Sequence, residues 1–445
     1  SVVIDEAVKK GVFGADGERI NSAIKNSGTI SANGGKVILT AKVLKGVFDY
    51  AINNSGIIEA KSVANHNGVI ELVASGAPII NSGSLIAGEV KVNTDSGFIN
   101  NNIGKVISDG YGGLPNGGRI SIEAATILHQ GLISANAYEE GNAGQIIIVS
   151  QTSTTVDAGS TTEARALGLA GQGGRILIDS TGGNTVVNTN AVIDVSAGAI
   201  SGNAGFIEVS AFDQLGFYGV LNGRAPPGYQ AGTAILDPEN ASIGLDTSES
   251  PATFNINAIV WATGNITIDG DVTLIGAITL NLLADHADAT PDNWDTTVDP
   301  EIGQITRSGD FTITGPSATL NLKAGNGIGT SNNPLQTNVD SLSAEINPSS
   351  SGDIYISQGL TPLTLTEVSS PGSTIDITTN GDLYVEGPVT IGGEGAINLT
   401  ADGEYEETEF IVFGTISSQS GPINLTVIAD GSAGLGIFGG EITSS

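Results

Sequence analysis

A unit made of a turn that ends in glycine and a strand-like run recurs along the first half of this 445-residue chain. The clearest members begin 26, 30, 31 and 27 residues apart, at Gly118, Gly144, Gly174, Gly205 and Gly232. Each glycine precedes apolar residues that recur with a period of two, which is typical of a β-strand with one buried face. Short strands at this spacing predict a solenoid in which each repeat forms one coil.

A second family of turns has the sequence Asn-Ser-Gly and occurs at residues 26–28, 54–56 and 81–83. Each is followed by another short apolar alternation, so these residues predict further strands in the same coils. Because glycine tolerates positive φ, we expect the glycines of both families to adopt it where the chain turns from one face of the solenoid to the next.

The second half of the chain keeps this pattern, with Gly-Asn or Gly-Asp before alternating apolar residues at 264–268, 309–313, 352–356 and 381–385. We therefore predict an all-β protein, a right-handed parallel β-helix (β-solenoid) with projecting loops. A β-propeller is the alternative, but it requires antiparallel four-stranded blades of regular length.

The formal net charge of −31 is unevenly distributed. Residues 1–232 carry 14 basic and 19 acidic residues, a balance of −5, whereas residues 233–445 carry 2 and 28, a balance of −26. The repeat pattern also breaks near this point. We predict an N-terminal β-helix over residues 1–232, a transition segment over 233–262 and an acidic C-terminal β-helix over 263–445.

Charge and composition exclude several classes of partner. The acidic chain is unsuited to nucleic acid or to an anionic membrane surface, and no apolar run is long enough to insert into a bilayer. The chain has no cysteine, which excludes disulfides and thiolate metal sites. It also has no methionine, and the absence of both oxidisable side chains suits an exported protein.

Three segments interrupt the strand pattern and are expected to project as loops, where binding residues usually lie. They are residues 221–230, 284–302 and 402–409. Tyr229 and Trp294 lie in the first two and could stack on a sugar. Acidic residues gather in the second, at Asp285, Asp288, Asp292, Asp295, Asp299 and Glu301. Their oxygens suit Ca²⁺, but without a calcium-loop pattern we interpret this segment as an acidic solubilising loop and leave calcium open.

No residue is predicted to be catalytic, to bind a cofactor or to ligate a transition metal. Polysaccharide hydrolases with a β-helix need an ordered series of acidic, histidine and basic motifs, of which only Asn93-Thr94-Asp95 is present. In the acidic half, Lys323 could act as a base beside Arg307, but we interpret it as a solvated residue at a strand end. The histidines, at positions 66, 129 and 286, are too dispersed to ligate a metal.

The repeats resemble the filamentous haemagglutinin family of two-partner-secretion exoproteins. The resemblance is carried by residues 26–41, 53–60, 173–179 and 193–197, and it is most specific at 231–240, Ala-Gly-Thr-Ala-Ile-Leu-Asp-Pro-Glu-Asn. Weaker similarity continues through 325–330 and 333–335. The family's Asn-Pro-Asn-Leu or Asn-Pro-Asn-Gly signature is absent, because neither Asn333-Pro334 nor Asn347-Pro348 is followed by asparagine. We therefore expect the chain to begin downstream of that signature.

The resemblance implies export through an outer-membrane partner and display at the surface of, or release from, a Gram-negative-type bacterium. We expect a non-enzymatic adhesin shaft or a subunit of a head-to-tail filament, in which uncapped ends such as Val2–Ile4 and Ile442–Thr443 pair with other copies. Its partners would be copies of itself and a host or cell-surface glycan or protein. The alternatives are a polysaccharide-active lyase- or hydrolase-like enzyme and a carbohydrate-binding module.

Overall fold

The computed structural model describes residues 2–8, 11–63, 67–111, 113–245, 250–285, 303–403, 408–429 and 432–444. All regular structure in these ranges is β-strand, so the described chain contains no helix that could span a membrane. The chain divides into two compact units. Unit 1 comprises Ser1–Asp213 and Gly219–Ala234, and unit 2 comprises Gln214–Tyr218 and Ile235–Ser445. Strand β23 (Thr233–Asp237) lies across this division.

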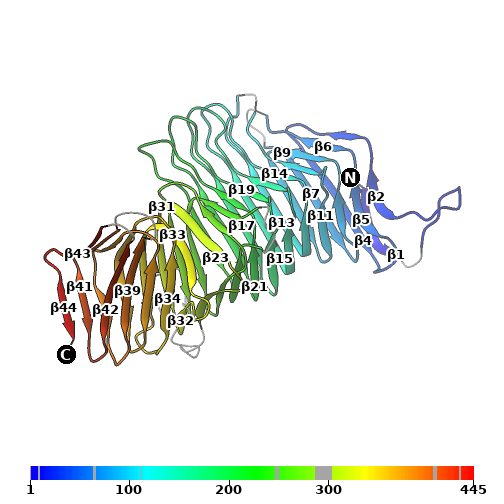
Figure 1. Cartoon of the computed structure of the whole chain (residues 1–445). Coiled ribbons are helices and arrows are strands. Elements are labelled where there is room, and N and C mark those ends of the chain that lie inside the picture. Colours follow the sequence, from blue (N-terminus) through cyan, green and yellow to red (C-terminus); the bar gives the residue numbers. More distant parts are fainter. Residues whose placement is uncertain are drawn as a thin grey trace. The chain divides into compact units, whose positions relative to one another are not determined.

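Unit 1 is built from three ladders of parallel strands stacked coil upon coil (Figure 1). The first ladder contains β1 (Val2–Val8), β4 (Lys36–Val43), β7 (Val69–Ser75), β10 (Glu89–Thr94), β13 (Arg119–His129), β15 (Gln145–Val156), β17 (Arg175–Ser180) and β20 (Phe206–Ala211). The second contains β2 (Ser22–Asn26), β5 (Tyr50–Asn54), β8 (Ile79–Asn81), β11 (Gly97–Asn100) and β18 (Asn184–Val187), with the ends of β13 and β15 between the last two. The third contains β3 (Thr29–Ser31), β6 (Ile57–Ala60), β9 (Ser84–Ala87), β12 (Lys105–Ile107), β14 (Leu132–Ser134), β16 (Thr161–Glu163), β19 (Val192–Asp194) and β22 (Val220–Asn222).

Unit 2 has the same construction. One ladder contains β21 (Gln214–Phe217), β24 (Asn240–Ile243), β27 (Ile266–Ile268), β30 (Gln304–Arg307), β32 (Gly327–Ile328), β34 (Asp353–Gln358), β36 (Ile375–Thr379), β39 (Ile397–Gly403) and β42 (Ile423–Ala429). A second contains β26 (Asn257–Ala262), β29 (Thr279–Ala284), β31 (Thr312–Ala324), β33 (Leu335–Ile346), β35 (Leu363–Ser370), β38 (Val389–Ile391), β41 (Thr415–Ser418) and β44 (Glu441–Ser444). The third contains β25 (Ala252–Asn255), β28 (Val272–Leu274), β37 (Leu383–Val385), β40 (Thr408–Val412) and β43 (Ala433–Ile437), joined through β31, β33 and β35. The predicted parallel β-helix is confirmed.

The core consists of columns of apolar side chains that repeat from coil to coil. In the first ladder of unit 1, strand pairing aligns one buried residue per coil: Val37, Ile70, Val90, Ile120, Ile146, Ile176 and Ile207. Most are residues that the alternation in sequence predicts to face inward. Branched side chains stacked on their own kind fill the interior with few gaps, which is the packing a pleated strand favours.

The prediction that the turn glycines require positive φ is wrong for most of them. Gly118, Gly144, Gly174 and Gly205 are absent from the described residues with positive φ. These positions require glycine for another reason. A Cβ at Gly144, Gly174 or Gly205 would overlap the carbonyl oxygen of the equivalent glycine one coil earlier. The Asn-Ser-Gly turns are built alike, with a Cβ at Gly56 overlapping the oxygen of Gly28. Close approach of two backbones therefore fixes these glycines.

Gly56 and Gly28 provide a matched test of this packing, because they occupy the same column. Gly28 lies in the first coil of its column, and a Cβ added to it would have no atom within 4 Å, whereas a Cβ at Gly56 would meet backbone. We expect Gly56→Ala to destabilise the protein by about 2–3 kcal/mol, the usual cost of overpacking. Gly28→Ala should change stability by less than about 0.5 kcal/mol.

Urea unfolding measures the free energy of unfolding of both variants. Replacing glycine with alanine lowers the entropy of the unfolded chain in both variants, so this effect cancels in the comparison. Equal unfolding midpoints for the two variants would show that backbone contact does not fix these glycines.

Candidate functional site

The residues that the sequence offers as candidate catalytic groups have structural roles in the fold. Asp95 Oδ1 accepts a hydrogen bond from the Gly76 amide at 2.8 Å, and Asn93 Nδ2 donates to Glu123 Oε2 at 3.2 Å. Arg307 is buried and donates to the carbonyl oxygens of Pro334 and Gly309, both at 2.6 Å. These contacts hold turns in place.

Lys323 differs from its expected state. It lies at the end of β31 as expected, but it is mostly buried rather than solvated, and its Nζ lies 2.7 Å from Glu345 Oε2 on the next coil. This ion pair joins β31 to β33 and gives Lys323 a structural role.

The acidic segment is only partly described. His66, His286, Trp294 and residues 286–302 lie outside the described residues, as do 404–407. Within the ranges that the structure does describe, no three His, Asp or Glu side chains are grouped so that they could hold a metal ion.

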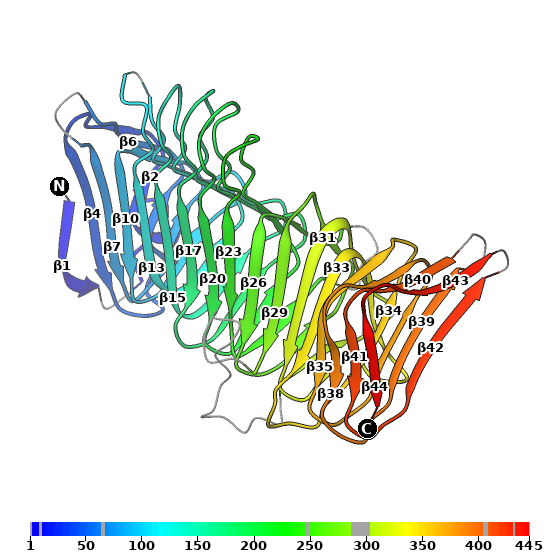
Figure 2. The same cartoon turned by 90° about the vertical axis from the view of Figure 1, so that its left-hand side faces the viewer.

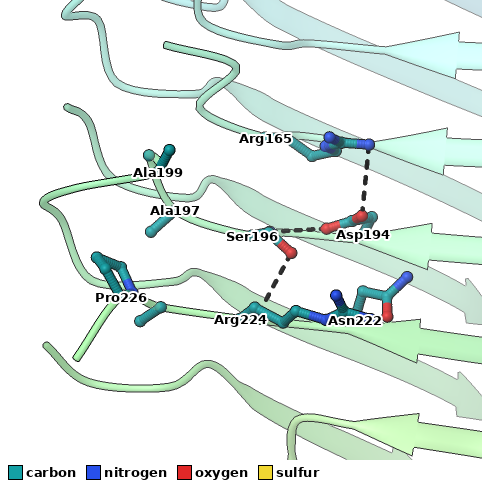
Figure 3. Close-up of a pocket in the computed structure, with 10 residues that line it drawn as sticks. Arg165, Asp194, Ser196, Ala197, Ala199, Asn222, Arg224 and Pro226 are labelled. Atoms are coloured by element: carbon teal, nitrogen blue, oxygen red, sulfur yellow. Dashed lines mark hydrogen bonds and ion pairs between the residues drawn. The ribbon is translucent and has the colours of Figure 1, made fainter. Parts of the chain in front are cut away.

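The strongest candidate site is a pocket of about 430 Å³ in unit 1 (Figure 3). It lies where three successive coils leave strands β16, β19 and β22 and enter loops that project from the coils, seen in cyan to green in Figure 2. Its polar side chains are Arg165, Asp194, Ser196, Asn222 and Arg224, which we call the polar pocket. Its wall is completed by small and apolar residues, namely Ala197, Gly198, Ala199, Ala225 and Pro226.

Strand register places these side chains one coil apart. Asp194 pairs with Asn222 and, on the other side, with Glu163. Two residues further on, the backbone ladder continues through hydrogen bonds from Ala166 N to Ser196 O at 3.1 Å and from Ala197 N to Arg224 O at 2.9 Å. The rigid coil spacing thus positions the pocket, although its residues lie about 30 positions apart in sequence.

The two charged side chains at the centre of the pocket restrain one another. Arg165 Nη1 lies 3.6 Å from Asp194 Oδ2 and 3.5 Å from Glu163 Oε2. The Ser196 amide donates to Asp194 Oδ1 at 2.8 Å and fixes the carboxylate from the other side (Figure 3). Arg165 Nε is buried and has no hydrogen-bond partner among the described residues. The pocket therefore offers the guanidinium groups of Arg165 and Arg224 as donors and one fixed carboxylate as an acceptor.

The polar surface continues into the preceding coils. Asn136 Nδ2 donates to Glu163 Oε1 at 2.7 Å, and the Asn136 amide donates to Asp109 Oδ1 at 2.7 Å. Burial raises the pKa of Asp109, and the negative charge of Glu163 adds to this effect. A second pocket of about 280 Å³ lies here, with Asp109 and Tyr111 in its lining.

Sequence reasoning finds only part of this site. The predicted projecting segment 221–230 supplies Asn222, Arg224 and Pro226, and Tyr229 is exposed on the same loop. The sequence does not predict that Arg165, Asp194 and Ser196 belong to the site, because their association depends on strand register. The available signal is a polar or charged residue two positions after the third strand of successive repeats, at Asp109, Asn136, Arg165, Ser196 and Arg224.

Comparison of the chain with models of protein families, with curated proteins and with solved structures yields no match. Functional inference therefore depends on the residues themselves.

His129 is buried and ends a ladder of asparagine side chains. Asn26 Nδ2 donates to Asn54 Oδ1 at 2.8 Å, Asn54 to Asn81 at 2.8 Å and Asn81 to Asn100 at 2.9 Å. Asn100 Nδ2 then lies 3.2 Å from His129 Nδ1, and His129 Nε2 lies 3.1 Å from the Thr161 carbonyl oxygen. Because the amide nitrogen donates and the carbonyl accepts, His129 is neutral and carries its proton on Nε2.

This environment makes His129 sensitive to acid. Burial lowers its pKa to about 4, from 6.5 for an ordinary histidine. The unfolded chain therefore binds a proton more readily than the folded protein between these two values. The stabilisation is complete above pH 6.5 and is lost as the pH falls to about 4, by roughly 3 kcal/mol.

We expect His129→Asn to remove this loss, because an asparagine can accept from Asn100 and donate to Thr161 O without a titrating group. Relative to the wild type, the variant should gain roughly 3 kcal/mol of stability on going from pH 7 to pH 4. Urea unfolding of both proteins across this range measures the difference, in which the carboxylates common to both cancel. Parallel stability curves would contradict a neutral, buried His129.

Proposed function

We propose that this chain is a non-enzymatic structural protein that acts outside the cell, as the shaft of an adhesin or as the repeating unit of a head-to-tail filament. The observation that carries the proposal is the surface formed by the last described coil of unit 2, which contains β42, β43 and β44.

Side chains of this coil occupy core positions and are not covered by the other described residues. Leu435 and Ile437 pair in register with Phe410 and Val412, which are fully buried, yet they are 50% and 49% exposed. Ile442 is 37% exposed, whereas its partner Ile416 is fully buried. A further coil stacked on this surface, from the same chain or from another copy, would bury these side chains, each with a gain of about 1 kcal/mol, and would satisfy the open strand edges.

The sequence supports an extracellular setting. The chain has no cysteine or methionine and is strongly acidic, and residues 231–240 resemble the filamentous haemagglutinin family. We propose on this basis that it is secreted or displayed at the cell surface of a Gram-negative-type bacterium with the help of an outer-membrane partner. The coils would then act mechanically, since stacked parallel strands form a stiff support for projecting loops.

Assembly through the open coil can be tested with a matched pair of substitutions. Leu435→Lys combined with Ile437→Lys places charge on the core positions of β43, and we expect it to abolish end-to-end assemblies seen by negative-stain electron microscopy. Ile428→Lys is the control, because Ile428 is 49% exposed but lies between inward-facing positions of β42.

If the wild-type protein remains a single species at high concentration, the result would contradict the role as a filament subunit and leave the role as an adhesin shaft. Assemblies that survive in the double variant would contradict the proposed surface. Cleavage of pectin, alginate or hyaluronan by the purified protein would contradict the non-enzymatic role.

A further inference from the structure

We propose that the polar pocket of unit 1 binds a carboxylated sugar, with the sugar carboxylate on Arg165 and Arg224 and its hydroxyl groups on Asp194 and Asn222. This inference goes beyond the structural role proposed above and does not depend on it, because the pocket and the open coil belong to different units.

Two arginines bring guanidinium donors to the pocket although the chain as a whole is acidic. Its charged lining consists of two arginines and one aspartate, and Glu163 lies beside it, 3.5 Å from Arg165. Arg165 Nε is buried without a partner among the described residues, and an unsatisfied donor of this kind costs about 1–3 kcal/mol. A guanidinium group presents its donors in a plane that matches a carboxylate. A carboxylate that enters the pocket would meet guanidinium donors of Arg165, whose side chain is 39% exposed, and of the exposed Arg224.

The acceptors of the pocket restrict which anion fits. The Asp194 carboxylate, held by the Ser196 amide, would repel an anion placed directly against it but accepts hydrogen bonds from hydroxyl groups. Asn222 pairs with Asp194 on the next coil, about 4.8 Å away. A ligand must thus present a negative group at the arginines and hydroxyl groups at Asp194 and Asn222. A six-membered sugar ring with one carboxylate has this arrangement.

The rest of the pocket suits the apolar face of a sugar ring. Ala197, Ala199 and Pro226 form a wall beside the polar side chains (Figure 3), and Ala225 also lines the pocket. The volume of about 430 Å³ lies in the range of small-molecule sites. All these residues are positioned by stacked coils, so binding requires little ordering of the protein.

The experiment is isothermal titration calorimetry of the full chain with trigalacturonate, with sialyllactose and with neutral lactose. EDTA is present throughout, so that divalent ions cannot bridge an acidic sugar to acidic side chains. The two acidic ligands distinguish a hexuronate from a sialic acid as the source of the carboxylate. We expect at least one of them to bind and lactose to bind at least about tenfold more weakly.

Substitutions assign binding to the pocket. Arg224→Gln and Arg165→Gln should each weaken binding about tenfold or more, the effect of losing a charge-assisted hydrogen bond. Arg224 is exposed, so its substitution keeps the test valid if loss of Arg165 perturbs folding. Lys25→Gln removes the same charge from an exposed position on β2 and should leave binding unchanged.

Three results would overturn the proposal. They are the absence of binding by both acidic sugars at millimolar concentration, equal affinity for lactose, and unchanged affinity in both arginine variants. None of them bears on the assembly of the open coil.

Discussion

Parallel pairing in register is the interaction on which the rest of this molecule depends. It places each residue directly on the equivalent residue of the previous coil, at a separation of about 4.8 Å. Val37, Ile70 and Val90 form one column for this reason, and Gly118, Gly144 and Gly174 form another. Side-chain chemistry is therefore selected by column, since each residue must be compatible with its own kind above and below.

This constraint explains which polar residues the columns accept. Asparagine can stack on itself, because each amide donates to one neighbour and accepts from the other, as in the ladder from Asn26 to Asn100. Stacked like charges are unfavourable. Where they occur, as at Glu163 and Asp194, Arg165 contacts both carboxylates. A charge cluster in the polar pocket is thus balanced by the coil geometry, and Arg165 Nε remains without a hydrogen-bond partner among the described residues.

The sequence is sufficient to predict the fold, because column chemistry appears as a period of 26 to 31 residues and an alternation of two. It is less informative about individual positions. Turn chemistry alone predicts positive φ for the glycines of both families, whereas carbonyl contact between coils fixes most of them. In the sequence alone, Asn26, Asn54 and Asn81 look like turn residues. Alignment of the repeats on the glycine two residues later places all three in one column with His129, which precedes Gly131 by the same distance. The pocket is not predictable in this way, because variable loop lengths hide the register that joins Arg165, Asp194 and Arg224.

The same geometry supports both roles proposed above, the structural one and the binding one. A stiff stack of coils is useful as a shaft, and it also fixes side chains from three coils at set distances without a closing motion. A sugar acid is strongly hydrated and loses bound water when it enters a site. Its binding free energy is therefore most favourable where the charged groups of the protein are already restrained. Arg165 and Asp194 meet this condition through their contacts with Glu163 and the Ser196 amide. The outer edge of a solenoid coil can therefore acquire a specific ligand by changing a few side chains of one column while the apolar columns inside keep the fold.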